Sequence, residues 1–397
     1  MKGFTNENIK FDVLRQRAYN MRWAEQDTDV IPLTAADHDF PCAPEVVQAL
    51  QDYIKEGYFT YTPHRGFPSF KKAIAKAMKE RKNEDVNPDF VLPIDSAARG
   101  MKVIADAVLR PGDEVIVFDP VDFLFRTSME SAGAKVILFP TNLQSDCVSL
   151  EGLEDYITPK TKMLGFCNPH NPVGRVWTED EVRKIVELCK KYSVWLFSDE
   201  IHGDVVLYGH QYTSAARFAD VYDHMLVYTA ISKTFNMAGL HSSCTIIPNP
   251  EYKKIQEDTL RQAWLMSPNC MANSAIEACY TYGDEWVDEQ NAYLTENAEF
   301  VTSYLKEHAP QIKPVKPEGT YLMWLDCSEL SMTSEEIVKI LASEYKMAVG
   351  GGAGYQGNGE YFLRFNIGCP RETLEKGMEI LAQFVACLLY TSPSPRD

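Results

Sequence analysis

Lys233 has the surroundings of a lysine that reacts as an amine rather than one that serves as a surface charge. It follows the strand-like run 225–229, and small or hydroxyl side chains such as Ser232 and Thr234 lie on both sides of it. A lysine that forms a Schiff base must lose its proton and be reached by an aldehyde, and burial at a strand end lowers its pKa. A lysine at such a place can also extend its ammonium group to water. Polar residues upstream decide between these two interpretations.

Two more polar groups follow strand-like runs. Asp199 and His202 come after the apolar run 194–197, and Asn171 follows the run 162–167, in a turn made rigid by two Asn-Pro pairs. Open α/β folds bind ligands at the carboxyl edge of their parallel strands. Pyridoxal phosphate needs such a set: a carboxylate that keeps its ring nitrogen protonated, a donor to its ring hydroxyl and an amine for its aldehyde. The sequence therefore predicts a site for this cofactor.

The chain resembles the pyridoxal-phosphate enzymes of fold type I that are related to aspartate aminotransferase. Within them it is similar to the cystathionine β-lyase-like C–S lyases of the MalY/PatB type. The resemblance covers residues 11–385 and depends on five passages in the family's order: residues 35–40, 168–177, 198–204, 232–240 and 363–371. It implies the α/β fold of pyridoxal-phosphate-dependent transferases, pyridoxal 5'-phosphate as cofactor and an amino-acid substrate.

The resemblance assigns roles to the polar residues. It implies that Lys233 is the Schiff-base lysine, that Asp199 binds the ring nitrogen, and that Asn171 donates to the ring hydroxyl and helps to bind the substrate. It places His202 near the same hydroxyl. Arg364 matches the arginine that holds the substrate carboxylate, for which a guanidinium can supply two parallel hydrogen bonds. Taken singly, these residues have ordinary explanations as a helix cap, a structural histidine and a solvated edge charge.

The cofactor phosphate is expected at the start of a helix predicted over residues 97–109. Free N–H groups at a helix N-terminus suit a dianion, and Ser96, Ala97 and Ala98 are small enough to let it approach. An ordinary N-cap at Asp95 or Ser96 would explain the same pattern. The resemblance favours the phosphate, because Ala97 and Ala98 match its phosphate-binding positions. Ser232, beside the lysine, is a second phosphate candidate.

Tyr61 matches the tyrosine that reaches the phosphate from a neighbouring subunit in the family. The resemblance therefore implies a homodimer and gives Tyr61 a part in cofactor binding and catalysis. A bare tyrosine in this context would more often belong to the core.

The sequence departs from the family pattern in two places. Ile94 and Asp95 stand where the phosphate site usually opens with glycine, and an acid beside a dianion is unfavourable unless it points away. Asp122 stands where the family has a tyrosine stacked over the cofactor ring. Phe123, one residue along, is the candidate to supply that ring instead.

The elements that position these residues alternate between short apolar runs and longer amphipathic ones. We expect strands over residues 114–118, 135–139, 162–167, 194–197, 225–229 and 244–247, with helices such as 179–192 between them. This pattern predicts a large, doubly wound, mostly parallel sheet. Beyond Gly283 a smaller α+β domain is predicted from helices over 285–308 and 334–345, a strand over 361–366 and a last helix over 372–386.

The predicted organisation has four parts. They are an N-terminal segment that packs with the small domain (1–50), a large cofactor-binding domain (51–284), the small domain (285–386) and a stretch that resembles non-native sequence (387–397).

Composition favours a cytoplasmic enzyme. The chain has 397 residues, of which 45% are hydrophobic, so it can bury a large core. Its 39 basic and 56 acidic residues give a net charge of -17, which disfavours nucleic acid and anionic membranes as partners. Its ten cysteines are scattered without metal-ligand spacing, so no metal site is predicted and the cysteines suit a reducing compartment.

The function that follows is cleavage of the Cβ–S bond of L-cystathionine or related S-substituted cysteines, with pyruvate, ammonia and a thiol as products. Lys233 would remove the Cα proton. One alternative is an aminotransferase, since the same carbanion can be reprotonated on the cofactor. The other is a lyase-like regulator that binds a transcription factor through its surface.

Overall fold

A seven-stranded sheet forms the larger part of the computed structural model, which describes residues 4–63, 65–141, 149–263, 268–355 and 357–391. Its strands are β2 (Val91–Ile94), β3 (Glu114–Asp119), β4 (Lys135–Pro140), β5 (Thr161–Cys167), β6 (Trp195–Asp199), β7 (Met225–Ala230) and β8 (Ser243–Ile246). They lie in the order β2-β8-β7-β6-β5-β3-β4. The pairs from β4 through β3, β5 and β6 to β7 are parallel, whereas β8 is antiparallel to β7 and β2. The predicted α/β fold with a mostly parallel sheet is confirmed.

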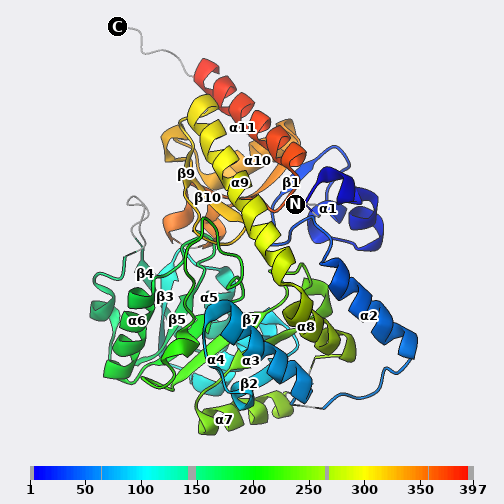
Figure 1. The fold of residues 1–397 in the computed structure, drawn as a ribbon. Coiled ribbons are helices and arrows are strands. Elements are labelled where there is room, and N and C mark those ends of the chain that lie inside the picture. Colours follow the sequence, from blue (N-terminus) through cyan, green and yellow to red (C-terminus); the bar gives the residue numbers. More distant parts are fainter. Residues whose placement is uncertain (1–3, 64, 142–148, 264–267, 356, 392–397) are drawn as a thin grey trace.

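Helices cover both faces of this sheet (Figure 1). Alternate residues of β3 lie in two different cores: Ile116 and Phe118 in one, and Val115 and Val117 in the other. Strands buried on both faces read as continuous apolar runs, which is why these strands could be predicted. The helices of this lobe are α3 (Pro68–Lys82), α4 (Ala97–Val108), α5 (Phe123–Ser131), α6 (Glu179–Tyr192), α7 (Pro250–Gln262) and α8 (Cys270–Tyr282).

Helix α6 shows how sequence sets the bounds of an element. It begins with a capping box, in which Thr178 and Glu181 each bond the other's backbone N–H, and it ends at Ser193 in a left-handed conformation. Acidic residues lie in its first turn and basic ones in its last, as the helix dipole favours. Its buried residues recur at helical spacing: Val182, Ile185, Val186 and Cys189.

The parallel strands bring their polar carboxyl ends together. Cys167 at the end of β5 pairs with Asp199 at the end of β6, and Asp199 pairs in turn with Tyr228 of β7. The Asn168 N–H donates to the carbonyl of Asp199 at 2.9 Å. The segments that follow β5, β6 and β7 therefore all begin at the same edge of the sheet.

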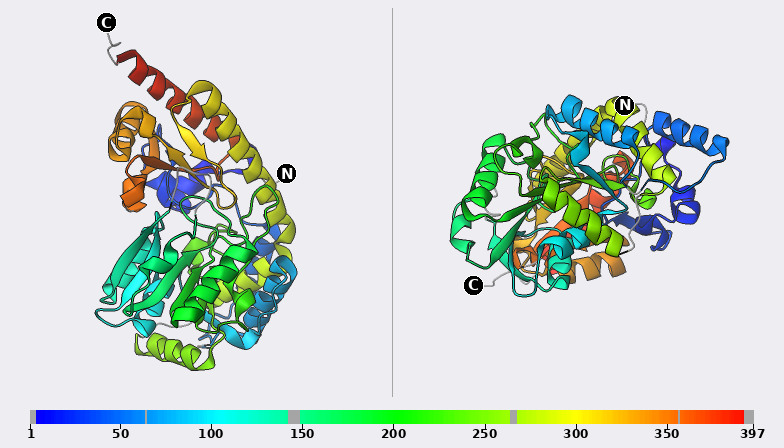
Figure 2. Two further views of the ribbon diagram at one scale, coloured as in Figure 1. Left: turned by 90° about the vertical axis from the view of Figure 1, so that its left-hand side faces the viewer. Right: turned by 90° about the horizontal axis from the view of Figure 1, so that it is seen from below.

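The smaller sheet has five strands in the order β1-β11-β12-β10-β9. They are β1 (Ile31–Leu33), β9 (Lys313–Val315), β10 (Leu322–Asp326), β11 (Met347–Gly351) and β12 (Phe362–Asn366), with helices α9 (Asp284–His308), α10 (Ser334–Glu344) and α11 (Arg371–Thr391) beside them. β1 is parallel to β11, so the N-terminal segment contributes an edge strand to this sheet. The left view of Figure 2 shows the smaller lobe above the larger one.

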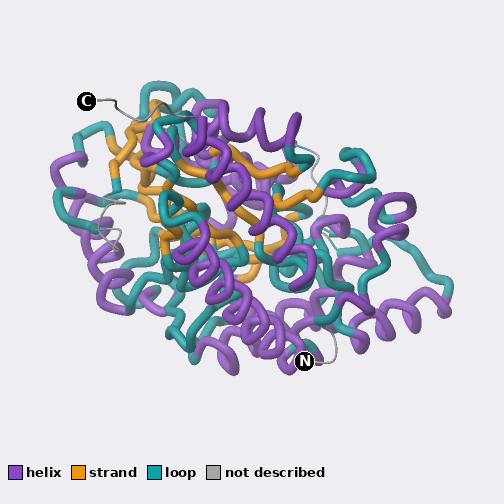
Figure 3. The backbone as a smooth tube through the Cα atoms, turned by 90° about the horizontal axis from the view of Figure 1, so that it is seen from above, coloured by secondary structure: helices purple, strands orange, loops and turns teal. Residues whose placement is uncertain are grey.

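Short N-terminal helices and α2 lie at one side of the molecule. α1 (Met21–Ala24) contacts β1, and α2 (Pro44–Glu56) packs against α8. Figure 3 shows strands in the interior with helices around them. Several of the exposed large apolar side chains belong to α2 and the connection that follows it: Val47, Ile54, Tyr58, Phe59 and Tyr61.

The last helix continues farther than predicted. We expected it to end at Ala386, but α11 continues to Thr391. No glycine or proline interrupts the chain between Ala386 and Thr391, so nothing in the sequence ends the helix there. In the part of the chain that the structure describes, no helix is long and apolar enough to cross a membrane.

Candidate active site

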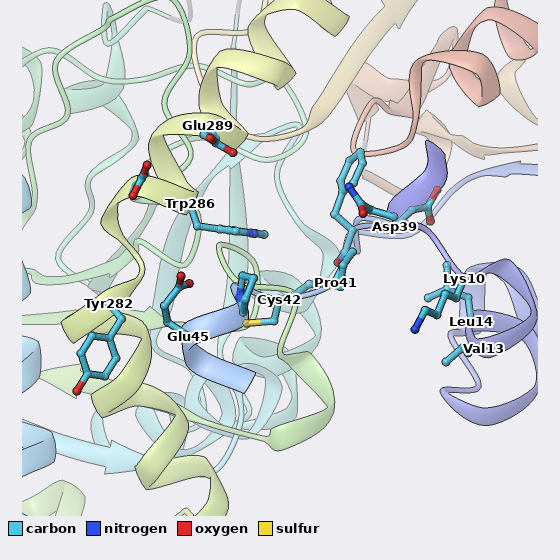
Figure 4. Close-up of a pocket in the computed structure, with 15 residues that line it drawn as sticks. Lys10, Val13, Leu14, Asp39, Pro41, Cys42, Glu45, Tyr282, Trp286 and Glu289 are labelled. Atoms are coloured by element: carbon cyan, nitrogen blue, oxygen red, sulfur yellow. The ribbon is translucent and has the colours of Figure 1, made fainter. Parts of the chain in front are cut away.

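A cavity of about 290 Å³ opens at the carboxyl edge of the parallel strands. It brings together most of the predicted site: Lys233, Asp199, Asn171, His202, Ser96, Ala98 and Ser232. A larger hollow of about 890 Å³ lies elsewhere, between the N-terminal segment, the start of α2 and the start of α9 (Figure 4). It contains Trp286 and Glu289 but none of the predicted site residues, so the chemistry points to the smaller cavity.

Lys233 is held against the first of the five motif passages. Its Nζ donates to the carbonyl oxygen of Ala36 at 2.7 Å, and the hydroxyl of Tyr321 donates to the same oxygen at 2.7 Å. Burial lowers the pKa of Lys233, although the charges of Asp37, Asp122 and Asp199 oppose that change. A neutral amine is the form that can attack an aldehyde or accept a proton.

The passage that supplies Ala36 is itself held by a side chain from the small sheet. Asn366 of β12 donates through Nδ2 to the carbonyls of Thr34, Ala35 and Asp37, at 3.2, 2.8 and 2.7 Å. Ala35 has a φ of +37°, which is unusual for a residue with a side chain. The sequence passages 35–40 and 363–371 thus meet in space.

Asp199 is buried at the end of β6. Burial raises its pKa to about 7; the charges of Asp122 and Glu200 act in the same direction, and Lys233 opposes them. Its Oδ1 accepts the N–H of Ile201 at 3.2 Å. A protonated ring nitrogen beside it would stabilise the carboxylate form, because an opposite charge at short range favours ionisation.

His202 is buried three residues farther on, with its ring edge-on to Tyr321 and the two ring centres 5.5 Å apart. Burial and the charges of Lys233 and Arg364 lower its pKa well below the usual value, so it is neutral. Its Nδ1 is buried and has no hydrogen-bond partner among the described residues. A ring hydroxyl of a cofactor would supply such a partner.

Asn171 connects two charged side chains. Its Nδ2 donates to Asp122 Oδ2 at 2.8 Å, and its Oδ1 accepts from Arg364 Nη1 at 3.4 Å. The guanidinium carbon of Arg364 lies 5.0 Å from the centre of the Tyr355 ring. Arg364 is buried in β12 of the small sheet and does not itself line the cavity; it contacts the cavity wall through its bond to Asn171.

The hypothesis that Phe123 covers the cofactor ring is not supported by the structure. Phe123 is 50% exposed, and the cavity is lined by Asp122 and Leu124 on either side of it. Asp122 is the N-cap of α5 and accepts the N–H of Leu124 at 2.9 Å. Its side chain therefore turns toward the cavity, while the first residue of the helix points away.

The phosphate candidates lie at the start of α4 and beside the lysine. Ser96 occupies the N-cap position but makes no side-chain cap bond, which leaves N–H groups of the first turn for another acceptor. Asp95 forms an ion pair with Arg99 through one oxygen. The hydroxyl of Ser232 is buried without a hydrogen-bond partner among the described residues. Ala97 begins the helix, but its side chain lies outside the described part of the chain.

Two further cavity residues were not foreseen. His241 and Ser242 line the same cavity as Ser96 and Ser232. Their only sequence signal is their place shortly after Lys233. Ala36 was also not predicted, because it contributes its backbone carbonyl oxygen, and an alanine side chain indicates no such role.

Tyr61 does not reach this cavity within one chain. It is 99% exposed in the connection between α2 and α3. Its predicted contact belongs to a second subunit and stays a prediction.

Taken together, the residues fit pyridoxal phosphate. Uncapped N–H groups and the unpartnered Ser232 hydroxyl suit its phosphate, Asp199 suits a protonated ring nitrogen, and Lys233 suits its aldehyde.

Comparison with known proteins gives concordant results. A model of the family described as aminotransferase class I and II matches residues 28–381. The chain is 34% identical to cystathionine beta-lyase PatB of Bacillus subtilis (strain 168), over 88% of this chain and 91% of PatB. It is 29% identical to protein MalY of Escherichia coli (strain K12), over 88% and 90% of the two chains. The structure of cystalysin from Treponema denticola, which contains a pyridoxal 5'-phosphate cofactor, superposes with a TM-score of 0.90 at 28% identity, covering 97% of this chain and 99% of cystalysin.

Proposed function

The chain belongs to the class I and II aminotransferase family, with pyridoxal 5'-phosphate as its cofactor, and we propose that it is a carbon–sulfur β-lyase. Its substrates are L-cystathionine or related S-substituted cysteines, and its products are pyruvate, ammonia and a thiol. The observation that carries the proposal is the half-buried Lys233, whose amine shares one cavity with Asp199 and Asn171. The similarity to PatB, a cystathionine β-lyase, supports elimination over other reactions of the family.

Lys233, Asp199 and Arg364 each have a distinct part in this reaction. The cofactor, when bound, supplies an aldehyde for the substrate amine and a ring that accepts the charge left at Cα. Lys233 takes the Cα proton, because its lowered pKa makes the neutral amine available. Asp199 holds the proton on the ring nitrogen, and Arg364 binds the substrate carboxylate. Loss of the thiolate from Cβ completes the elimination, and water then converts the three-carbon enamine that is released into pyruvate and ammonia.

The proposal extends to assembly and organisation. We propose a homodimer in which Tyr61 of one subunit contacts the phosphate bound by the other. Residues 51–284 would bind the cofactor, and residues 285–386 together with 1–50 would form the lobe that supplies Arg364. The described cysteines are all free, which suits a cytoplasmic enzyme.

The test is an assay of the purified protein with L-cystathionine. We expect pyruvate and free thiol in equal amounts, and neither product from Lys233→Ala. An aminotransferase would instead pass the amino group to an added 2-oxo acid without releasing thiol. A protein with neither reaction but a bound cofactor would favour a regulatory role, for which a pull-down would seek the partner.

A further inference from the structure

Asp122 places a carboxylate on the wall of the Lys233 cavity. Its Oδ1 accepts the N–H of Leu124 at 2.9 Å, and its Oδ2 accepts from Asn171 Nδ2 at 2.8 Å. Both donors are neutral amides. No described lysine, arginine or histidine forms an ion pair with it, so its charge is hydrogen-bonded but not balanced by a neighbouring cation.

The cations nearest to this carboxylate are engaged elsewhere. Lys233 donates to the carbonyl of Ala36, and Arg364 donates to the oxygen of Asn171. The charge of Asp122 nevertheless acts across the cavity: it opposes the lowering of the Lys233 pKa that burial causes, and it adds to the raising of the Asp199 pKa that burial causes. A charge on a bound ligand would experience the same field.

The positions of Lys233 and Arg364 would place a substrate side chain within range of the Asp122 charge. A bound amino acid would have its amine near Lys233 and its carboxylate at Arg364, and the Arg364 guanidinium is joined to Asp122 through the single Asn171 carboxamide. Asp122 lines the same cavity as Lys233, so an amino acid bound between Lys233 and Arg364 would lie within range of its charge.

We propose that Asp122 selects substrates by the net charge at the end of the side chain. The cavity accepts amino acids whose side chains end in a cationic or net-neutral group, which includes the zwitterionic end of L-cystathionine, and rejects those whose side chains end in a carboxylate alone. The inference rests on the proposed function in one respect, namely that an amino acid enters this cavity with its amine at Lys233. It adds a property that a helix cap alone would not confer. A purely structural Asp122 would cap α5 and orient Asn171 without distinguishing between ligand charges.

A series of S-substituted L-cysteines of similar length separates these roles. S-(2-aminoethyl)-, S-propyl- and S-(2-carboxyethyl)-L-cysteine end in a positive, a neutral and a negative group. The holoenzyme is titrated with each, and the half-saturating concentration is read from the change in visible absorption of the bound cofactor. This signal reports binding whether or not a thiol is subsequently released, so absence of lyase activity and absence of charge selection are separate outcomes.

We expect the aminoethyl compound to bind at least about tenfold more tightly than the carboxyethyl compound, because opposite and like charges a few ångströms apart differ by that much at a partly buried site. Asp122→Ser keeps a good N-cap but removes the charge, and should reduce the difference to within about threefold. Asp122→Glu keeps the charge and should preserve the order. Equal binding of the two charged ligands to the wild-type protein would overturn the proposal, as would an unchanged difference in Asp122→Ser.

Discussion

Arg364 provides the sharpest test of how this cavity holds a substrate. Its guanidinium is buried in β12, faces the Tyr355 ring at 5.0 Å and donates to Asn171 Oδ1 at 3.4 Å. That bond engages Nη1, so other N–H groups of the fork can meet a carboxylate. Arg364→Ala would remove the charged donor that bonds Asn171, whose carboxamide lines the cavity beside Asp122 and Asp199.

The magnitude follows from the strength of such bonds. Hydrogen bonds that involve charged groups contribute about 1.5 to 3 kcal/mol, and each 1.4 kcal/mol is about a factor of ten. We therefore expect Arg364→Ala to raise KM for L-cystathionine by about 10-fold to 150-fold. Arg364→Lys should recover only part of this loss, because an ammonium group cannot form the two parallel bonds of a guanidinium.

Steady-state kinetics of pyruvate release measure this effect, and Arg371→Ala is the matched control. Arg371 lies seven residues later, donates to Asn297 at 3.1 Å and stacks on Phe300; neither of these partners lines the cavity, whereas Arg364 bonds the cavity residue Asn171. Its loss should leave KM unchanged. If Arg364→Ala left KM as in the wild type, or if both variants raised it equally, Arg364 would not be the carboxylate ligand.

Three further predictions address the cofactor. Lys233→Ala should abolish the visible absorption band of the bound cofactor; a variant that kept the band would remove Lys233 from its assigned role. In cofactor-free protein, the pKa of Asp199 rises from 3.8 to about 7, so the unfolded state binds fewer protons between these values and stability falls as pH increases through that range. Asp199→Asn lacks this titrating group, so its free energy of unfolding, measured in urea, should fall less between pH 4 and pH 7 than that of the wild type, by up to about 4 kcal/mol. An equal fall in both proteins would show that Asp199 does not titrate in that range. Ser232→Ala should weaken binding of pyridoxal phosphate to cofactor-free protein but not of pyridoxal, and an equal loss for both would place its hydroxyl away from the phosphate.

The strands that could be predicted differ physically from those that could not. The parallel strands β3, β5, β6 and β7 are buried on both faces and read as apolar runs. β1 and β2 contain Pro32 and Pro93, and β11 ends in two glycines, so their sequences carry the signals of turns. Their pairing depends on distant segments, as in β1 with β11, and no local pattern reports such a partner.

The candidate site shows the same division between side chains and backbone. Lys233, Asp199 and Asn171 could be proposed because each follows a strand and carries a group with its own chemistry. The carbonyl of Ala36 could not, since every residue has one and only the fold selects which of them meets an amine.

Asp122 and Phe123 show how the start of a helix sets the directions of neighbouring side chains. From the sequence, Phe123 is the candidate to supply the ring of the missing tyrosine from one residue away. An aspartate before a helix, however, turns its carboxylate toward the N–H groups of the first turn, here that of Leu124. Phe123 then begins the helix and faces outward, where it is half exposed. The cap that directs Asp122 toward the cavity also directs Phe123 away from it. A negative charge therefore stands at the cavity wall in place of an aromatic ring, and Phe123 cannot replace that ring from the next position.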